Sequence, residues 1–195
     1  MGTEHRQPVR VVVLSASLRR SSLNERLAGL AEQVIQQKGA TAERAAMGDF
    51  DCVSFDFDVE QETGVPEPAA RFRRWLEAAD AFVIASPEYN ASVPGALKNA
   101  LDWASRPLAT NVFRNKPVVV IGSSSGVFGA VWAQAELRKV LGAMGARVVE
   151  AEVAVGRAHE KLDADGNLAD DDVRDQLLDA LATLRSEAAP QLAAA

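Results

Sequence analysis

The chain has little of what metal and disulfide chemistry needs. One cysteine, Cys52, stands among 195 residues, which excludes an internal disulfide and any iron–sulfur or zinc site built from several cysteines. No lysine, arginine or histidine lies next to Cys52 in the sequence, so we expect its thiol to be unreactive. The two histidines, His5 and His159, lie far apart in polar surroundings, and we expect both on the surface rather than at a metal.

Long apolar runs and an excess of positive charge are also missing. No apolar run reaches the roughly 18 residues that a membrane span needs. The first ten residues, MGTEHRQPVR, lack the apolar segment of a secretion signal, and Arg6 breaks the myristoylation pattern. The formal net charge of −6 leaves no basic stripe for nucleic-acid phosphates. We therefore expect a cytoplasmic protein that binds neither membranes nor nucleic acid.

What is present is the pattern of an α/β domain. The chain is 48% apolar and 25% charged, which is ordinary for one globular domain. Short apolar, β-branched runs predict five strands, at residues 9–15, 44–47, 81–86, 116–124 and 146–155. Helical spacing of apolar residues predicts helices between and after them, at residues 27–35, 72–79, 92–104, 133–144 and 173–184. We expect one doubly wound domain over residues 9–188, with a parallel five-stranded sheet and helices on both faces.

The ends of several predicted elements carry recognisable signals. Ser92 is placed to cap the third helix, with Pro94 in its first turn, and Asp170 to Asp172 suit the positive end of the last helix. The sequence DADGNLADDD at 163–172 is similar to a calcium loop, but Gly166 stands at the wrong position, so a turn before a helix is expected. Residues 1–8 and 189–195 are expected to be tails, the second one disordered.

In a doubly wound sheet, ligands bind beyond the carboxyl ends of the strands. The loop after the first strand reads SASLRRSSLNERLA, with serines, arginines and an asparagine before a helix. Hydroxyls, free N–H groups and a helix N-terminus together make an anion site, although Ser22 also suits an ordinary helix cap. The dinucleotide and P-loop glycine patterns are absent, so the loop predicts a site for a single terminal phosphate.

The loops after the third and fourth strands add two further candidate surfaces. Tyr89 offers a flat face and Asn90 offers hydrogen bonds, which suits a planar heterocycle; a tight turn with Tyr89 folded on the surface is the alternative. The sequence IGSSSGVFGA at 121–130 combines glycines, which let backbone approach a ligand, with serine donors. Glycine and serine fill many such loops, but three polar loops at neighbouring strand ends are stronger evidence than any one of them.

These residues resemble the flavodoxin-like NADPH-dependent FMN reductase family, which includes quinone, azo-dye and chromate reductases. ASLRRSSLN is similar to the family motif G-S-x-R-x-x-S-x-N, with Ala16 in place of the glycine. PEYNASVPGALKNALDW, from Pro87 to Trp103, matches the family's second motif without a break. Residues 122–129 correspond to its third, glycine- and serine-rich loop, and the similarity covers about residues 9–185.

The resemblance implies an enzyme that passes hydride from NADPH or NADH, through bound FMN, to a small acceptor such as a quinone, free flavin, azo compound or metal oxyanion. FMN carries the chemistry, so no catalytic side chain and no metal are expected. The implied FMN-binding residues are Ser15, Ser17, Arg19, Ser22, Leu23, Asn24, Pro87, Glu88, Tyr89, Asn90, Ser123, Ser124, Ser125 and Gly126. By the same resemblance, the phosphate would be held by Ser17, Arg19, Ser22 and Asn24. Residues 87–90 would border the ribityl chain and ring, and residues 124–126 would cover the pyrimidine end.

The resemblance also implies a homodimer or homotetramer with flavin sites near a subunit interface. Trp103, Ser105 and Arg106 would be able to reach such an interface, while Arg106 alternatively suits the negative end of its helix. Lys98 is expected on a solvated helix face rather than in catalysis. A one-electron carrier of the flavodoxin type and a non-catalytic flavin-binding sensor or interaction module are the alternative functions. The acceptor and the preference between NADPH and NADH have no signature in the sequence.

Overall fold

The computed structural model describes residues 8–163 and 166–189. Its strands are β1 (Arg10–Ser15), β2 (Thr41–Ala46), β3 (Ala81–Ser86), β4 (Pro117–Ser123), β5 (Arg147–Val148) and β6 (Val153–Val155). Its α-helices are α1 (Leu23–Gln37), α2 (Phe57–Thr63), α3 (Glu67–Glu77), α4 (Gly95–Ala104), α5 (Val131–Ala143), α6 (Ala158–Lys161) and α7 (Asp171–Ala188). Two 3₁₀ turns, η1 (Met47–Asp49) and η2 (Leu108–Thr110), complete the elements. The expected tails lie almost wholly outside the described residues.

The strands form one parallel sheet in the order β2-β1-β3-β4-β5, and β6 also pairs with β4. This confirms the predicted doubly wound sheet, with two corrections. The first is that the expected fifth strand at 146–155 is two short strands. Val149 still donates to the Val118 carbonyl, but Ala151 donates back to the Val149 carbonyl, so the chain bends away from β4 before β6. The second correction is that the second strand is shifted, because β2 is a half-exposed edge strand without a fully apolar run.

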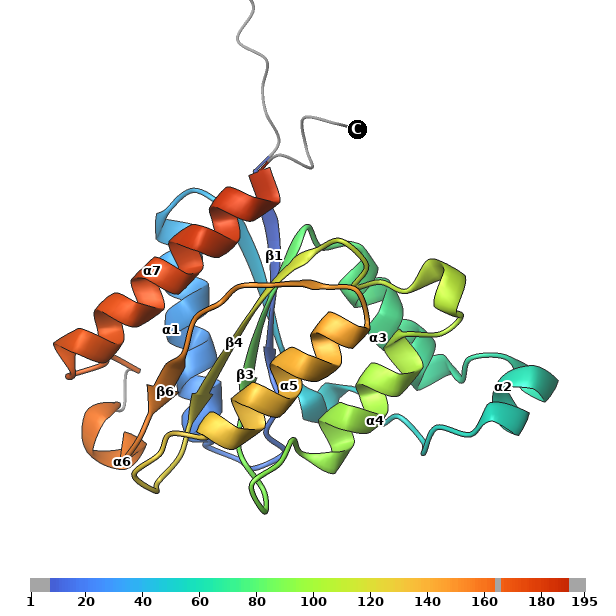
Figure 1. Cartoon of the computed structure of the whole chain (residues 1–195), viewed down its shortest axis with the longest axis horizontal. Coiled ribbons are helices and arrows are strands. Elements are labelled where there is room, and N and C mark those ends of the chain that lie inside the picture. The colour runs from blue at the N-terminus through green and yellow to red at the C-terminus, as the bar shows by residue number, and fades with distance from the viewer. Residues whose placement is uncertain (1–7, 164–165, 190–195) are drawn as a thin grey trace, which may run out of the picture.

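Helices cover both faces of the sheet, as predicted (Figure 1). Successive side chains of a strand point to opposite faces, so Val11 and Val13 of β1 pack with α1 and α7, while Val12 and Leu14 pack with α3, α4 and α5. Phe72, Leu97 and Leu101 of this second layer are fully buried. The two layers hold the strands rigidly, and the loops at the carboxyl ends of the strands are therefore fixed at their bases.

Residues 50–66, which include α2, form a segment that projects from the side of the domain, here called the excursion (Figure 1). Side chains of α4 hold this segment in place. Asn99 accepts a hydrogen bond from the Phe55 amide at 2.7 Å and donates to the Cys52 and Val53 carbonyls at 3.0 and 2.9 Å. The Trp103 indole N–H also donates to the Val53 carbonyl, at 2.8 Å. Trp103 is fully buried, so the expectation that it reaches a subunit interface is wrong.

The side chains of Arg106 and Lys98 make contacts within the domain. The Arg106 guanidinium lies 4.9 Å from the centre of the Phe55 ring, and its Nε is 3.7 Å from a Glu60 carboxylate oxygen. Arg106 thus connects the end of α4 to the excursion, a role that neither sequence interpretation included. Lys98 pairs with Asp102 one turn along α4 and is half exposed, as expected for a solvated helix face.

The predicted helix ends give mixed outcomes. Ser22 caps α1 by accepting from the Asn24 amide at 3.1 Å, and Asp170 caps α7 by accepting from the Val173 amide at 3.2 Å. The predicted cap at Ser92 is wrong, because α4 begins at Gly95 with Pro94 in the cap position. Val93 and Pro94 separate Ser92 from the helix.

The segment before α7 was considered above as a possible calcium loop. A turn precedes α7 as expected, with the Asp163 carboxylate accepting from the Asn167 amide at 2.8 Å, and residues 164–165 lie outside the described residues. Within 8–163 and 166–189, no group of three or more potential ligands is arranged for a metal, and no helix combines the length and hydropathy of a membrane span. His159 is exposed, and His5 falls outside those ranges.

The Cys52 thiol is half-buried and free. Burial raises its pKa above the ordinary value, and the nearby Asp51 carboxylate raises it further. Arg71, distant in sequence but near in space, acts in the opposite direction and is outweighed. A thiol with a raised pKa is largely protonated at neutral pH, which is the condition expected of an unreactive cysteine.

Candidate functional site

The loops after β1, β3 and β4 meet at the carboxyl edge of the sheet, at the bottom of Figure 1, and enclose a hollow of about 150 Å³. The residues that line it are Ser17, Arg19, Ser22, Leu23, Asn24, Pro87, Glu88, Tyr89, Ser123, Ser124 and Ser125. The structure thus brings together all the predicted site residues except Ser15, Asn90 and Gly126. A larger hollow of about 250 Å³ between α1 and α7 has a mainly aliphatic lining without hydroxyl groups.

The first loop has the features of an anion site. Ser22 lines the hollow and also caps α1, so both interpretations of this serine hold in the structure. Ser17 is buried, and its hydroxyl accepts from the Arg19 amide at 3.2 Å. Because the positive end of α1 and the exposed Arg19 side chain adjoin the same hollow, a negatively charged group is favoured there.

Asn24 joins the first loop to the third. Its side-chain oxygen accepts from the Ser123 amide and its side-chain nitrogen donates to the Ser123 carbonyl, both at 2.9 Å. The residue is only 3% exposed. The resemblance assigned Asn24 to the phosphate, whereas the structure directs its side chain to the backbone across the hollow. The pair fixes the distance between two walls of the site.

The second loop is a tight hairpin that presents Tyr89. Tyr89 and Ser92 exchange two backbone hydrogen bonds of 3.1 Å. Between them, Asn90 and Ala91 have positive φ angles of 53° and 58°, as a type I′ turn requires. The tight-turn alternative is therefore confirmed as a backbone shape. Tyr89 is 50% exposed and still lines the hollow, while Asn90 occupies the tip of the turn.

Two glutamates attach this hairpin to α5. A carboxylate oxygen of Glu88 accepts from the Ala133 amide, in the first turn of α5, at 3.0 Å. On the other limb, the Ser92 hydroxyl donates to Glu136 at 2.5 Å, and the Val93 amide donates to the same oxygen at 3.4 Å. The Ser92 hydrogen bond lowers the pKa of the Glu136 carboxyl below its usual value. Glu136 could not be predicted from the sequence, because an exposed glutamate on a helix carries no signal of its partner.

The third loop is shaped by close backbone packing against residues 154–157. A Cβ added at Gly156 would lie 1.8 Å from the Val127 carbonyl oxygen, and one at Gly129 would lie 2.5 Å from the Ala154 carbonyl carbon. Inside the loop, the Ser124 hydroxyl accepts from the Gly126 amide at 2.9 Å. The Gly126 amide therefore orients the Ser124 hydroxyl from outside the hollow. The close backbone packing leaves the loop little freedom to move outward.

Two buried hydroxyls at this edge have no hydrogen-bond partner within the described part of the chain. They belong to Ser15, at the end of β1, and Ser123, at the end of β4. Ser123 lines the hollow. A buried polar group without a partner is costly, so each one in a native protein calls for an explanation, such as a functional role or a bound water or ion. The donor set, the helix end and the unpaired Ser123 hydroxyl fit a phosphorylated ligand such as FMN.

The strand order 2-1-3-4-5, with helices on both faces of the parallel sheet, is that of the flavodoxin-like class. The fold matches a variant flavodoxin from Pseudomonas aeruginosa, with a TM-score of 0.58 at 18% identity over 90% of this chain and 99% of that one. The family model for NADPH-dependent FMN reductases matches residues 9–160. The chain belongs to the NADPH-dependent FMN reductase family.

Individual relatives agree with this assignment. The chain is 35% identical to a 2-hydroxy-1,4-benzoquinone reductase from Burkholderia, over 87% of this chain and 90% of the relative. It is 36% identical to an NAD(P)H-dependent FMN reductase from Pseudomonas aeruginosa, over 91% and 94% of the two chains. The solved structure of FerB, a flavoenzyme NAD(P)H:(acceptor) oxidoreductase from Paracoccus denitrificans, superposes with a TM-score of 0.79 at 32% identity, over 92% and 97%.

Proposed function

We propose that the chain is an FMN-dependent NAD(P)H oxidoreductase whose flavin site is the hollow between the three loops. The observation that carries the proposal is that the loops enclose one hollow holding a helix N-terminus, a ring of serines and an unpaired buried hydroxyl. In this proposal Ser17, Arg19 and Ser22 hold the phosphate. Pro87 and Tyr89 border the ribityl chain and ring, and Ser124 to Gly126 cover the pyrimidine end.

FMN, when bound, supplies the two-electron chemistry that links a nicotinamide cofactor to an acceptor. The chain's own residues bind and orient it. The Asn24 pair with Ser123 keeps the phosphate loop and the third loop at a fixed separation, and the Glu88 contact keeps the second loop beside them. Tyr89 stands half exposed at the mouth, so a ring lying against it remains accessible to two substrates in turn.

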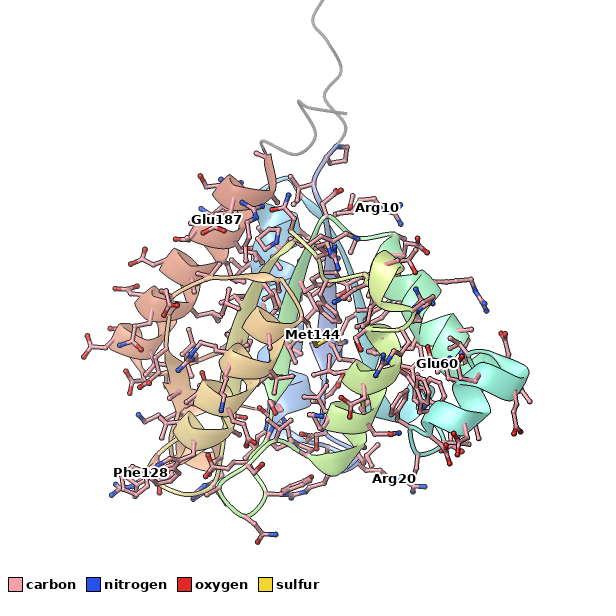
Figure 2. The ribbon with its side chains drawn as sticks, turned by 45° about the vertical axis from the view of Figure 1, so that its right-hand side comes forward. Arg10, Arg20, Glu60, Phe128, Met144 and Glu187 are labelled. Carbon is pink, nitrogen blue, oxygen red and sulfur yellow. The ribbon has the colours of Figure 1, made fainter. Side chains whose placement is uncertain are left out.

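The acceptor we propose is a quinone, because relatives that share a third of the sequence over nearly the whole chain are named quinone reductases. We also propose a homodimer or homotetramer. Three apolar side chains in and just after the third loop are exposed: Val127 by 64%, Phe128 by 61% and Trp132 by 49%. Their exposure favours contact with a second copy. Figure 2 shows Phe128 at the outer edge of the molecule. With one cysteine and no disulfide, the cytoplasm remains the proposed location.

A comparison of FMN with riboflavin tests the site, since the two ligands differ only in the phosphate. We expect FMN to bind the purified protein at least about 100-fold more tightly, because a buried charged group gains several hydrogen bonds there. Arg19→Gln should weaken FMN binding about tenfold and leave riboflavin binding unchanged. Arg10→Gln, at the opposite edge of the sheet (Figure 2), is the matched control. Equal affinities for the two flavins would overturn the phosphate site.

Anaerobic mixing with NADPH and NADH tests the activity. We expect prompt loss of the absorbance of bound oxidised flavin, followed by its recovery when a benzoquinone is added. A protein that binds FMN but is not reduced by either nicotinamide cofactor would instead be an electron carrier or a binding module.

A further inference from the structure

The hairpin of residues 87–93 is closed by two backbone hydrogen bonds between Tyr89 and Ser92. Its two-residue turn contains Ala91 in a left-handed conformation, and Tyr89 to Ala91 are exposed. A two-stranded hairpin is marginally stable at best by itself. The position of the Tyr89 ring at the mouth of the hollow therefore depends on what holds the two limbs.

Both limbs of the hairpin are hydrogen-bonded to α5. The accepting carboxylate belongs to the hairpin on one limb and to the helix on the other. On the first limb, Glu88 of the hairpin accepts from the Ala133 amide of the helix. On the second limb, Glu136 of the helix accepts from the Ser92 hydroxyl and, at longer range, from the Val93 amide. Glu88 belongs to the flavin site already described, whereas Glu136 lies outside the hollow.

We propose that Glu136 is a positioning residue, which sets the place of the Tyr89 ring by holding the second limb of the hairpin through Ser92. Its consequence for flavin binding rests on the proposed function, while its consequence for the hairpin does not. The 2.5 Å separation from the Ser92 oxygen is that of a charge-assisted hydrogen bond. The lowered pKa of Glu136, which Lys139 and Lys98 also favour, keeps it ionised at neutral pH.

The sequence offers a direct probe, because Tyr89 is the chain's single tyrosine. Protein labelled with 3-fluorotyrosine gives one ¹⁹F resonance, and that resonance reports only on Tyr89. In the flavin-free protein, Glu136→Gln and Ser92→Ala should both move it toward the position of the free amino acid and narrow it. Ser92→Thr, which keeps the hydroxyl, should restore the wild-type signal. The matched control is Glu67→Gln, at an exposed glutamate on α3.

An unchanged resonance in Glu136→Gln would overturn the inference, whatever the protein binds. Titration of the wild-type protein with FMN tests the proposed function separately: a resonance that does not respond to FMN would refute Tyr89 as part of the flavin site. If both the inference and the proposed function hold, Glu136→Gln should weaken FMN binding roughly threefold to tenfold, the net value of one ordinary hydrogen bond, because the Tyr89 ring is then held less firmly. If Glu136→Gln displaces the resonance but binds FMN as tightly as the wild-type protein, the position of Tyr89 does not affect FMN binding.

Discussion

Ala91 is an alanine held in a left-handed backbone conformation, which its side chain disfavours. It occupies the second central position of a type I′ turn with a φ of 58°, where a Cβ is disfavoured. Asn90, at the first position, tolerates this conformation better because its short polar side chain bonds locally. The turn therefore keeps its shape at a cost that the rest of the hairpin and α5 must offset.

Ala91→Gly should stabilise the protein by about 0.5–1 kcal/mol, since relief of the left-handed strain exceeds the extra flexibility of glycine when unfolded. Urea denaturation followed by tryptophan fluorescence measures the change. Ala182→Gly, on the exposed face of α7, is the control and should cost about 1 kcal/mol. A loss of stability in both variants would mean that Ala91 is not strained.

The residues of the site were more predictable from the sequence than their hydrogen-bond partners. The serines of the first and third loops and Tyr89 were predictable because they follow buried strands, whose ends meet at one edge. The hydrogen bonds of Asn24, Glu88 and Glu136 were not, because each joins segments whose distance is set only by the folded sheet. Ser92 is a further example. A serine before a helix suggests a helix cap, but in the hairpin its hydroxyl donates to Glu136 instead.

Among the elements, the third loop depends most on a close approach of two backbones. The Gly156 Cα faces the Val127 carbonyl so closely that any side chain must push the loop away. The serines that we propose at the pyrimidine end of the flavin lie in this loop, directly before Val127.

Gly156→Ala should weaken FMN binding at least about tenfold, because a shift of the loop by more than an ångström removes its hydrogen bonds to the ligand. Gly142→Ala is the matched control, because that glycine lies in α5 with open space around its Cα. We expect it to leave FMN binding unchanged and to add about 1 kcal/mol of stability. Fluorescence quenching of FMN gives both affinities, and comparable values for the two variants would contradict the role assigned to the loop.

Most element boundaries followed from periodicity, because long apolar patterns bury a face whatever surrounds them. Among the strands, the two corrections concern the outer ones. β2 is half exposed, so its alternating pattern is weak, and β5 and β6 share one apolar run that the chain divides by a bend. Burial cannot be read from a run of valines when only part of it pairs with a neighbour.

For the whole molecule, ligand binding at three loops should be felt by the entire domain. A ligand that binds only the folded state stabilises it by about 2.7 kcal/mol at 100 times its Kd. For a chain of 195 residues this corresponds to a rise in Tm of roughly 5–10 °C. Differential scanning calorimetry with FMN, and with riboflavin for comparison, measures it. If FMN does not raise the Tm, the proposal that the hollow binds FMN is wrong.

The bend between β5 and β6 has a consequence for how molecules of this protein meet one another. A straight, fully extended outer strand offers unpaired N–H and C=O groups on which a strand of another molecule can add. Here the outer strand beside β4 is broken after Val148, and the other outer strand, β2, carries Glu43 and Arg44, the latter paired with glutamates of α1. Both borders of the sheet thus disfavour the addition of a strand from another molecule.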